Sequence, residues 1–162
     1  MTLPDTLRLN AFGFYEIKQK PTPEELRDYY AKRYYQEDLT TYQPEYPAEE
    51  LEHIEGKLRL RHWVLEQLRK GSGAGSFLDI GCGEGWALDY FQRQGWEVLG
   101  LDFSSFSLEK FHPTLRGQLR TGDLYEEVQK LVAASERFDV LWLDNVLEHV
   151  LEPADLLPHC RT

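Results

Sequence analysis

A run of apolar residues that leads directly into closely spaced glycines is the strongest structural signal in this sequence. It spans residues 77–85, where Phe-Leu-Asp-Ile is followed by Gly81, Gly83 and Gly85. The apolar run predicts a buried strand. The glycines predict a tight turn, because glycine adopts backbone conformations closed to other residues and lets a ligand approach the main chain. In open α/β sheets such turns lie at the carboxyl edge, so a ligand site is expected here.

The residues after this turn alternate between short apolar segments and amphipathic segments. This alternation is typical of parallel βαβ units, so we expect an α/β domain with helices on both faces of a parallel sheet. Right-handed crossovers place the first strand inside that sheet. The expected strands cover residues 76–80, 96–101, 118–121 and 138–143, and the expected helices cover residues 85–94, 105–111 and 124–134.

A glycine-rich segment, residues 71–75, separates this domain, residues 71–162, from an N-terminal arm, residues 1–70. The arm is rich in tyrosine and is expected to be helical. Its tyrosines either form a lid over the ligand site or cover the sheet and its exposed edge.

Two helices are expected in the arm. Thr22 and Glu25 have the spacing of a capping box, which predicts a helix from there to about Gln36. The second helix starts at Pro47, stops at Gly71 and packs one apolar face on the domain. That face consists of Leu51, Ile54, Leu58, Leu65 and Leu68.

Length and charge exclude several classes of protein. A chain of 162 residues fits one domain with a single sizeable core. Its formal net charge of -10 repels a phosphate backbone, so no nucleic-acid partner is expected. The sequence has neither an apolar stretch of membrane-spanning length nor a signal peptide pattern, so we expect a soluble, cytoplasmic protein with no membrane span.

Two further sets of residues predict no site. Cys82 and Cys160 lack the spacing of a metal site or a disulfide framework, and Cys82 is expected to be a small buried side chain. A basic group on the second arm helix is expected to be solvated surface without a function. It consists of Lys57, Arg59, Arg61, Arg69 and Lys70.

The charges around the glycine turn distinguish between possible ligands. A phosphate-binding loop offers backbone amides and often a lysine to an anion, whereas Asp79 enters this turn and Glu84 lies within it. Two carboxylates would repel a pyrophosphate, but they favour a sulfonium cofactor, which is cationic and carries no phosphate. The third glycine also comes one residue too early for the G-x-G-x-x-G pattern.

Two acids at later strand ends are candidate ligand contacts, each with a structural alternative. Asp102 ends the second strand, where a carboxylate can accept hydrogen bonds from both ribose hydroxyls, or it caps the turn before Ser104. Asp123 follows the third strand, and it either accepts a proton from an adenine amino group or is the N-cap of the helix that begins at Leu124.

Polar residues also follow the fourth strand, at Asp144, Asn145 and His149. This strand end faces the same crevice as the glycine turn. His149 is a candidate general base, because the pKa of an imidazole lies in the useful range, although a single histidine one turn into a helix is also a common structural residue.

The motifs at residues 78–85, 100–102, 138–140 and 145–150, taken in this order, resemble those of the Rossmann-like S-adenosylmethionine-dependent methyltransferases. The resemblance implies that S-adenosylmethionine is the cofactor and that the sheet order is 3-2-1-4. It implies that the methionine end is lined by Asp79, Gly81, Gly83 and Gly85, with Cys82 adjoining. It further implies that Asp102 holds the ribose, with Phe103 beside it, and that Asp123 and Leu124 border the adenine.

By the same resemblance, Asp144, Asn145 and His149 contact the sulfonium and the acceptor. The tyrosine-rich arm is similar to leaders of methyltransferases in bacterial surface-glycan pathways, so we expect a small-molecule or glycan acceptor. No metal is expected.

The sequence departs from this family in one respect, since the family generally has seven strands and only four are expected here. An open fourth strand invites pairing with another chain, so we expect a homo-oligomer or a completing partner at that edge. A catalytically incomplete subunit or fragment is therefore one alternative function. A second alternative is an NAD-dependent oxidoreductase, which shares the strand, the glycine turn and the ribose acid.

Overall fold

The computed structural model describes residues 4–10, 13, 15–22, 24–25, 28–29, 45–71 and 73–161. Its strands are β1 (Leu7–Leu9), β2 (Tyr15–Ile17), β3 (Ser76–Ile80), β4 (Glu97–Asp102), β5 (Leu119–Thr121) and β6 (Val140–Trp142). Its α-helices are α2 (Ala48–Leu68), α3 (Trp86–Arg93), α4 (Phe106–Phe111), α5 (Leu124–Ala133) and α6 (Pro153–Leu156). Two 3-10 helices are η1 (Pro113–Gln118) and η2 (Leu157–Arg161).

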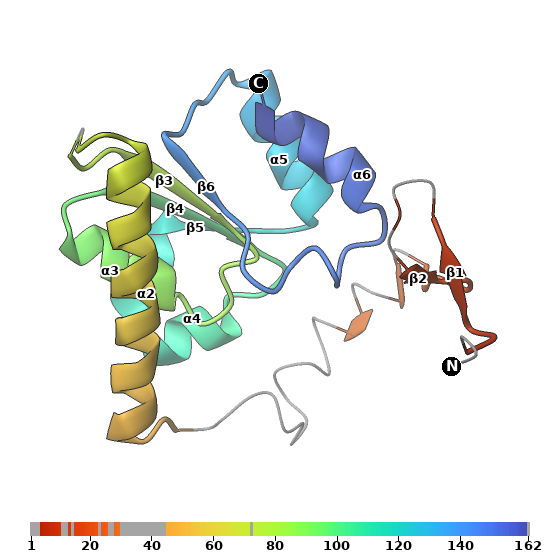
Figure 1. Ribbon diagram of the computed structural model, residues 1–162, viewed down its shortest axis with the longest axis horizontal. Helices are drawn as coiled ribbons and strands as arrows, with labels where there is room; N and C mark the ends of the chain where they lie inside the picture. The colour runs from red at the N-terminus through yellow and green to blue at the C-terminus, as the bar shows by residue number, and fades with distance from the viewer. Residues whose placement is uncertain are drawn as a thin grey trace.

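Four parallel strands form the central sheet in the order β5-β4-β3-β6 (Figure 1). The first strand of the domain, β3, therefore lies inside the sheet, and Leu78 in its centre is opposite Leu99 of β4 and Leu141 of β6. The predicted order is confirmed. Because the strands are parallel, the ends of β3, β4 and β6 meet at one edge.

Helices cover both faces of the sheet (Figure 1). Phe77 points to the face covered by α2, α3 and α4, where its ring stacks on Phe91 with 4.1 Å between centroids. Leu78 and Ile80 point to the other face, which α5 and α6 cover. This alternation along β3 also directs Asp79 to the α2 side, because successive side chains of a strand point to opposite faces.

Helix α2 confirms the predicted second arm helix but only part of its predicted apolar face. Leu58 is buried, and Ile54 and Leu65 pack against the same core. Leu68, in contrast, is 75% exposed, and Leu51 is also exposed. The 21-residue α2 is much longer than the eight-residue α3 on which it packs, so its first and last turns extend beyond the core. Among the described helices, none has the length and apolar character needed to cross a membrane.

The N-terminal arm, which was expected to be helical, also contains an antiparallel pair of strands, β1 and β2, before its first predicted helix. The predicted capping box is present: the Thr22 amide donates to Glu25 at 2.8 Å, and the Glu25 amide donates to the Thr22 hydroxyl at 3.2 Å. Most of the helix predicted to follow it lies outside the described residues. Lys20 binds the Leu151 carbonyl at 2.8 Å, so the arm contacts the segment after β6.

Two glycines offer a matched test of this packing. A Cβ on Gly100 of β4 would lie 2.6 Å from Leu88 and 2.8 Å from the Cys82 sulfur, whereas a Cβ on Gly56 of α2 meets nothing within 4 Å. We expect Gly100→Ala to destabilise the fold by about 1–3 kcal/mol through overpacking. Gly56→Ala should stabilise it by about 0.5–1 kcal/mol through helix propensity. Urea unfolding measures both, and equal effects would contradict the packing described here.

Candidate active site

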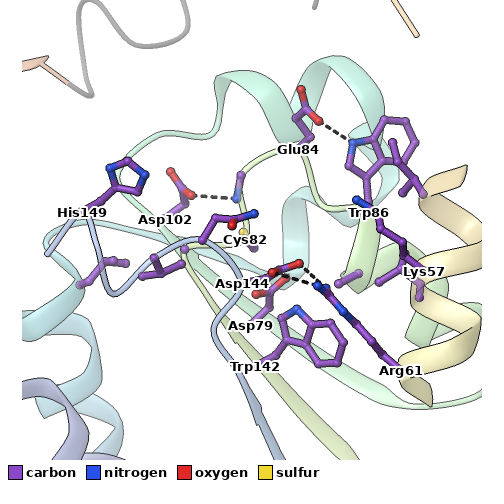
Figure 2. A pocket seen from close by; sticks show the side chains of 18 of the residues that line it. Lys57, Arg61, Asp79, Cys82, Glu84, Trp86, Asp102, Trp142, Asp144 and His149 are labelled. Atoms are coloured by element: carbon purple, nitrogen blue, oxygen red, sulfur yellow. Dashed lines mark hydrogen bonds and ion pairs between the residues drawn. The ribbon is translucent and has the colours of Figure 1, made fainter. Parts of the chain in front are cut away.

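A cavity of about 480 Å³ opens at the carboxyl edge of the sheet, between the glycine turn, α2 and the segment after β6 (Figure 2). Its volume lies in the range of small-molecule sites. Of the predicted site residues, all but Gly85 and Asp123 line it. Those that do are Asp79, Gly81, Cys82, Gly83, Asp102, Phe103, Leu124, Asp144, Asn145 and His149.

The glycine turn is shaped by close contacts with its neighbours. Gly81 has a φ of +76°, and a Cβ there would lie 2.6 Å from a methyl carbon of Val146. Backbone conformation and space thus both require glycine at this position. Gly85, with a φ of +83°, is the residue that leads from the turn into α3.

The backbone amides of the turn are used within the protein. Gly81 and Cys82 both donate to the Leu101 carbonyl, at 2.8 and 3.0 Å. Gly83 donates to the Asp102 carboxylate at 2.9 Å, and Gly85 donates to the Cys82 carbonyl. A diphosphate would need such amides as donors. This hydrogen bonding therefore disfavours a nucleotide diphosphate in the turn.

Two backbone amides fix the carboxylate of Asp102, which is 7% exposed. One oxygen accepts from Gly83, and the other accepts from Ser104 at 3.1 Å. Burial raises the pKa of Asp102, and hydrogen bonds from the backbone amides of Gly83, Ser104 and Phe103 act in the opposite direction. The predicted turn contact with Ser104 is thus observed, but the same carboxylate also lines the cavity, so the two interpretations of Asp102 are compatible.

Asp79 is a buried acid that lines the cavity. Its side chain is 4% exposed, and among residues 45–71 and 73–161 no hydrogen bond or ion pair holds its carboxylate. Burial raises the pKa of Asp79 well above its usual range, and the charges of Asp102 and Asp144 raise it further. A buried carboxylate without a cation is costly, so this position favours a positively charged ligand group.

A cation from α2 reaches into the cavity beside these acids (Figure 2). Both terminal nitrogens of Arg61 donate to Asp144, one of them at 3.3 Å, and the guanidinium lies over the Trp142 ring at 5.4 Å from its centroid. Lys57 lines the same cavity. The structure differs here from the expectation that the basic group is only solvated surface, because periodicity did not show that α2 passes the end of β6.

Glu84 is bound to donors from two other segments. The Tyr46 hydroxyl donates to both of its oxygens, at 2.7 and 2.9 Å, and the Trp86 indole donates at 2.5 Å. His112 hydrogen-bonds the Glu84 carbonyl at 2.7 Å. The glycine turn is therefore tied to Tyr46, two residues before α2, and this tyrosine of the arm lines the cavity.

The remaining predicted residues lie around the other end of the cavity. The Asp123 carboxylate caps α5 by accepting from the amides of Tyr125 and Glu126, which is one of its two predicted roles, and Leu124 lines the cavity. Asn145 has a φ of +56°, in the left-handed region. Asn145 and His149 both line the cavity.

The cysteines and possible metal ligands add no second site. Burial raises the pKa of the Cys82 thiol well above its usual range, which makes the thiol unreactive at neutral pH. Both cysteines are free. Within the described part of the chain, no three side chains of His, Cys, Asp or Glu are grouped to hold a metal ion.

Comparison with known protein families shows to which family the chain belongs. Residues 48–162 match a family described as "Methyltransferase domain". The chain belongs to this methyltransferase family. The match includes α2 together with the glycine turn and the whole parallel sheet. The predicted family, with S-adenosylmethionine as its cofactor, is confirmed.

Curated relatives carry a more specific name. A "Ubiquinone biosynthesis O-methyltransferase" of Leptothrix cholodnii is 33% identical over 113 residues, which are 67% of this chain and 46% of the relative. A protein of the same name from Cereibacter sphaeroides is 38% identical over 86 residues, 52% of this chain and 34% of the relative. The chain thus spans less than half the length of these relatives.

Solved structures confirm the fold. A SAM-dependent methyltransferase from Archaeoglobus fulgidus superposes with a TM-score of 0.53 at 23% identity, over 68% of this chain and 46% of that protein. EvdMO1 superposes with a TM-score of 0.51 at 26% identity, over 65% of this chain and 25% of that protein. The four-stranded sheet with its helices is therefore an α/β Rossmann-like arrangement shared with methyltransferases.

The state of Asp79 can be tested without ligand. Because the pKa of Asp79 is raised in the folded protein, its carboxyl costs stability that grows as the pH rises from the ordinary pKa of an aspartate through the raised one, and this cost is gone only below the ordinary pKa. We expect Asp79→Asn to raise Tm at neutral pH by about 2–4 °C, which corresponds to about 1 kcal/mol for a chain of this length. Thermal unfolding at several pH values checks this.

Asp139 is a control, because its pKa is shifted in the direction opposite to that of Asp79. Hydrogen bonds from Ser76 lower the pKa of Asp139, so its contribution to stability is present at neutral pH and is lost as the pH falls. Asp139→Asn should therefore lower Tm at neutral pH and have little effect in acid. An increase in Tm from Asp79→Asn that is the same at every pH would contradict the raised pKa of Asp79 as its cause.

Proposed function

We propose that this protein transfers a methyl group from S-adenosylmethionine to an oxygen atom of a small molecule. The observation that carries the proposal is the composition of one cavity. A buried acid without a hydrogen-bond or ion-pair partner among the described residues, Asp79, lies there beside an acid held by backbone amides, Asp102, and near a cation, Arg61. In the turn between them, the amides of Gly81, Cys82, Gly83 and Gly85 already donate to protein oxygens, which disfavours a diphosphate there.

The charges of the cavity match the two ends of the cofactor. Asp79 suits the ammonium group, and Arg61, whose planar fork matches a carboxylate, suits the carboxylate of the same amino-acid end. Asp102 is fixed at the end of β4, where a carboxylate can accept from both ribose hydroxyls. Phe103 and Leu124 line the apolar part of the cavity that we assign to the adenine.

Positioning accounts for most of the catalysis that we propose. When bound, the cofactor supplies an electrophilic methyl group on a sulfonium. The residues of this chain orient the reactants and exclude water, which together lower the barrier. His149 lines the cavity on the side of β6, and we propose that its imidazole accepts the proton of the acceptor hydroxyl.

The relatives support a small-molecule acceptor. Those reported above are named O-methyltransferases of ubiquinone biosynthesis. We therefore propose a hydroxyl of a small molecule as the acceptor. These names do not support a glycan.

Ligand binding tests this function. S-adenosylhomocysteine should raise the Tm of the purified chain, because a ligand that binds only the folded state stabilises it. NAD should have no effect, and stabilisation by NAD alone would support the oxidoreductase. A chain that responds to neither would support the catalytically incomplete subunit.

A matched pair of variants locates the ligand. Asp102→Ala should reduce the affinity for S-adenosylhomocysteine by at least tenfold, or about 1.4 kcal/mol, as the loss of hydrogen bonds to a charged group predicts. Asp139→Ala also removes a carboxylate bonded to backbone, but Asp139 does not line the cavity, so its affinity should equal that of the parent chain. Isothermal titration calorimetry measures both.

The outer edge of β6 is a second site of interaction that we propose. In the described sheet β6 pairs only with β3, so one side of the strand carries unpaired backbone groups. We propose that this edge pairs with a strand of a second copy when the chain is studied alone. Light scattering checks this, since a strictly monomeric chain would rule it out.

A further inference from the structure

The contact between Arg61 and Asp144 has a geometry that bears on ligand binding. Arg61 comes from α2 and Asp144 follows β6, so the ion pair connects two walls of the cavity (Figure 2). Both terminal nitrogens of the guanidinium donate to the carboxylate. One guanidinium edge that could bind a ligand carboxylate in a fork, the edge formed by the two terminal nitrogens, is therefore occupied by the protein itself.

We propose that Asp144 is a positioning residue that competes with the carboxylate of the cofactor for Arg61, so that this ion pair opens when the cofactor binds. The inference rests on the proposed function, in which Arg61 binds that carboxylate. It assigns to Asp144 a role that differs from direct contact with the acceptor.

The ion pair is weak enough to exchange. The side chains of Arg61 and Asp144 are 42% and 40% exposed, and pairs of this exposure contribute little net free energy because solvent screens them. A ligand carboxylate replaces the lost contact with one of the same chemistry. Trp142 lies under the guanidinium in either state and keeps Arg61 close to the cavity.

Release of Asp144 changes the charge around the buried acids. In the paired state Arg61 offsets the charge of Asp144, whereas in the exchanged state Asp144 is free to face a cation. The ammonium and the sulfonium of the bound cofactor are such cations. The exchange therefore gives the amino-acid end an anionic partner and a cationic partner at once, which selects a zwitterion over a simple anion.

A double-mutant cycle separates competition from mere proximity. Affinities for S-adenosylhomocysteine are measured by calorimetry for the parent chain, Asp144→Asn, Arg61→Gln and the double variant. The effect of Asp144→Asn is the ratio of the Kd with Asn to the Kd with Asp at position 144. This ratio should be about two- to fivefold smaller in the chain with Arg61 than in the chain with Gln at position 61. Asp144→Glu, which restores the carboxylate, should return Kd toward the parent value.

Two controls make the result specific. 5′-Methylthioadenosine lacks the amino-acid end, so its Kd should show no coupling between positions 61 and 144. Glu136→Gln opens an ion pair of similar exposure, that of Arg120 and Glu136, and should leave both affinities unchanged. Unfolding curves of each variant verify that the fold is intact.

The outcomes distinguish this inference from the function on which it rests. If the parent chain binds S-adenosylhomocysteine but the coupling is absent or reversed, the competition is wrong and the proposed function stands. Equal coupling with 5′-methylthioadenosine would also overturn it. If neither the parent chain nor any variant binds S-adenosylhomocysteine, both proposals fail.

Discussion

The Leu101 carbonyl accepts the amides of both Gly81 and Cys82, and these two hydrogen bonds fix the turn on which the site is built. They join the end of β3 to the end of β4 beyond the regular ladder. The Gly83 amide adds a third bond, to Asp102, so the turn and the carboxylate at the end of β4 position each other. Val146 packs against Gly81 from the other side, which brings the segment after β6 to the same place.

This arrangement determines what the cavity can bind. Amides that bind protein oxygens are not available to an anion, and within the described part of the chain no ion pair neutralises the buried acids Asp79 and Asp102. A ligand with a positive charge lowers the cost of burying Asp79, whereas a diphosphate would add to it. Hydrogen bonding and charge thus both favour a cationic ligand that carries no diphosphate.

Much of the fold could be predicted because its signals are local. The strand, turn and helix around Gly81 and the capping box at Thr22 are encoded within a few residues. Right-handed crossovers placed the first strand inside the sheet, and the family resemblance implied the full strand order. The antiparallel pair β1–β2 was missed because its strands have three residues each and carry exposed apolar side chains. Such short segments show no clear alternation.

The site was predictable only where its residues follow the sheet strands. Asp102 and His149 lie near strand ends, so topology alone brought them together. Arg61 and Tyr46 come from before the domain boundary that composition indicated, and no spacing in the sequence shows which face of α2 meets Asp144. Leu68 was misplaced for a related reason, since periodicity defines a helix face but not how far the core extends along it.

Helix α2 links the arm to the walls of the cavity through two contacts. Tyr46, two residues before the helix, binds Glu84 in the glycine turn, and Arg61, about four turns later, binds Asp144. Between them, Leu58 fixes the helix on the core. A shift of α2 along its axis would strain both contacts together, because each joins the helix to a different strand end. The position of the arm and the shape of the cavity are therefore not independent, even though most of the arm lies far from the sheet in sequence.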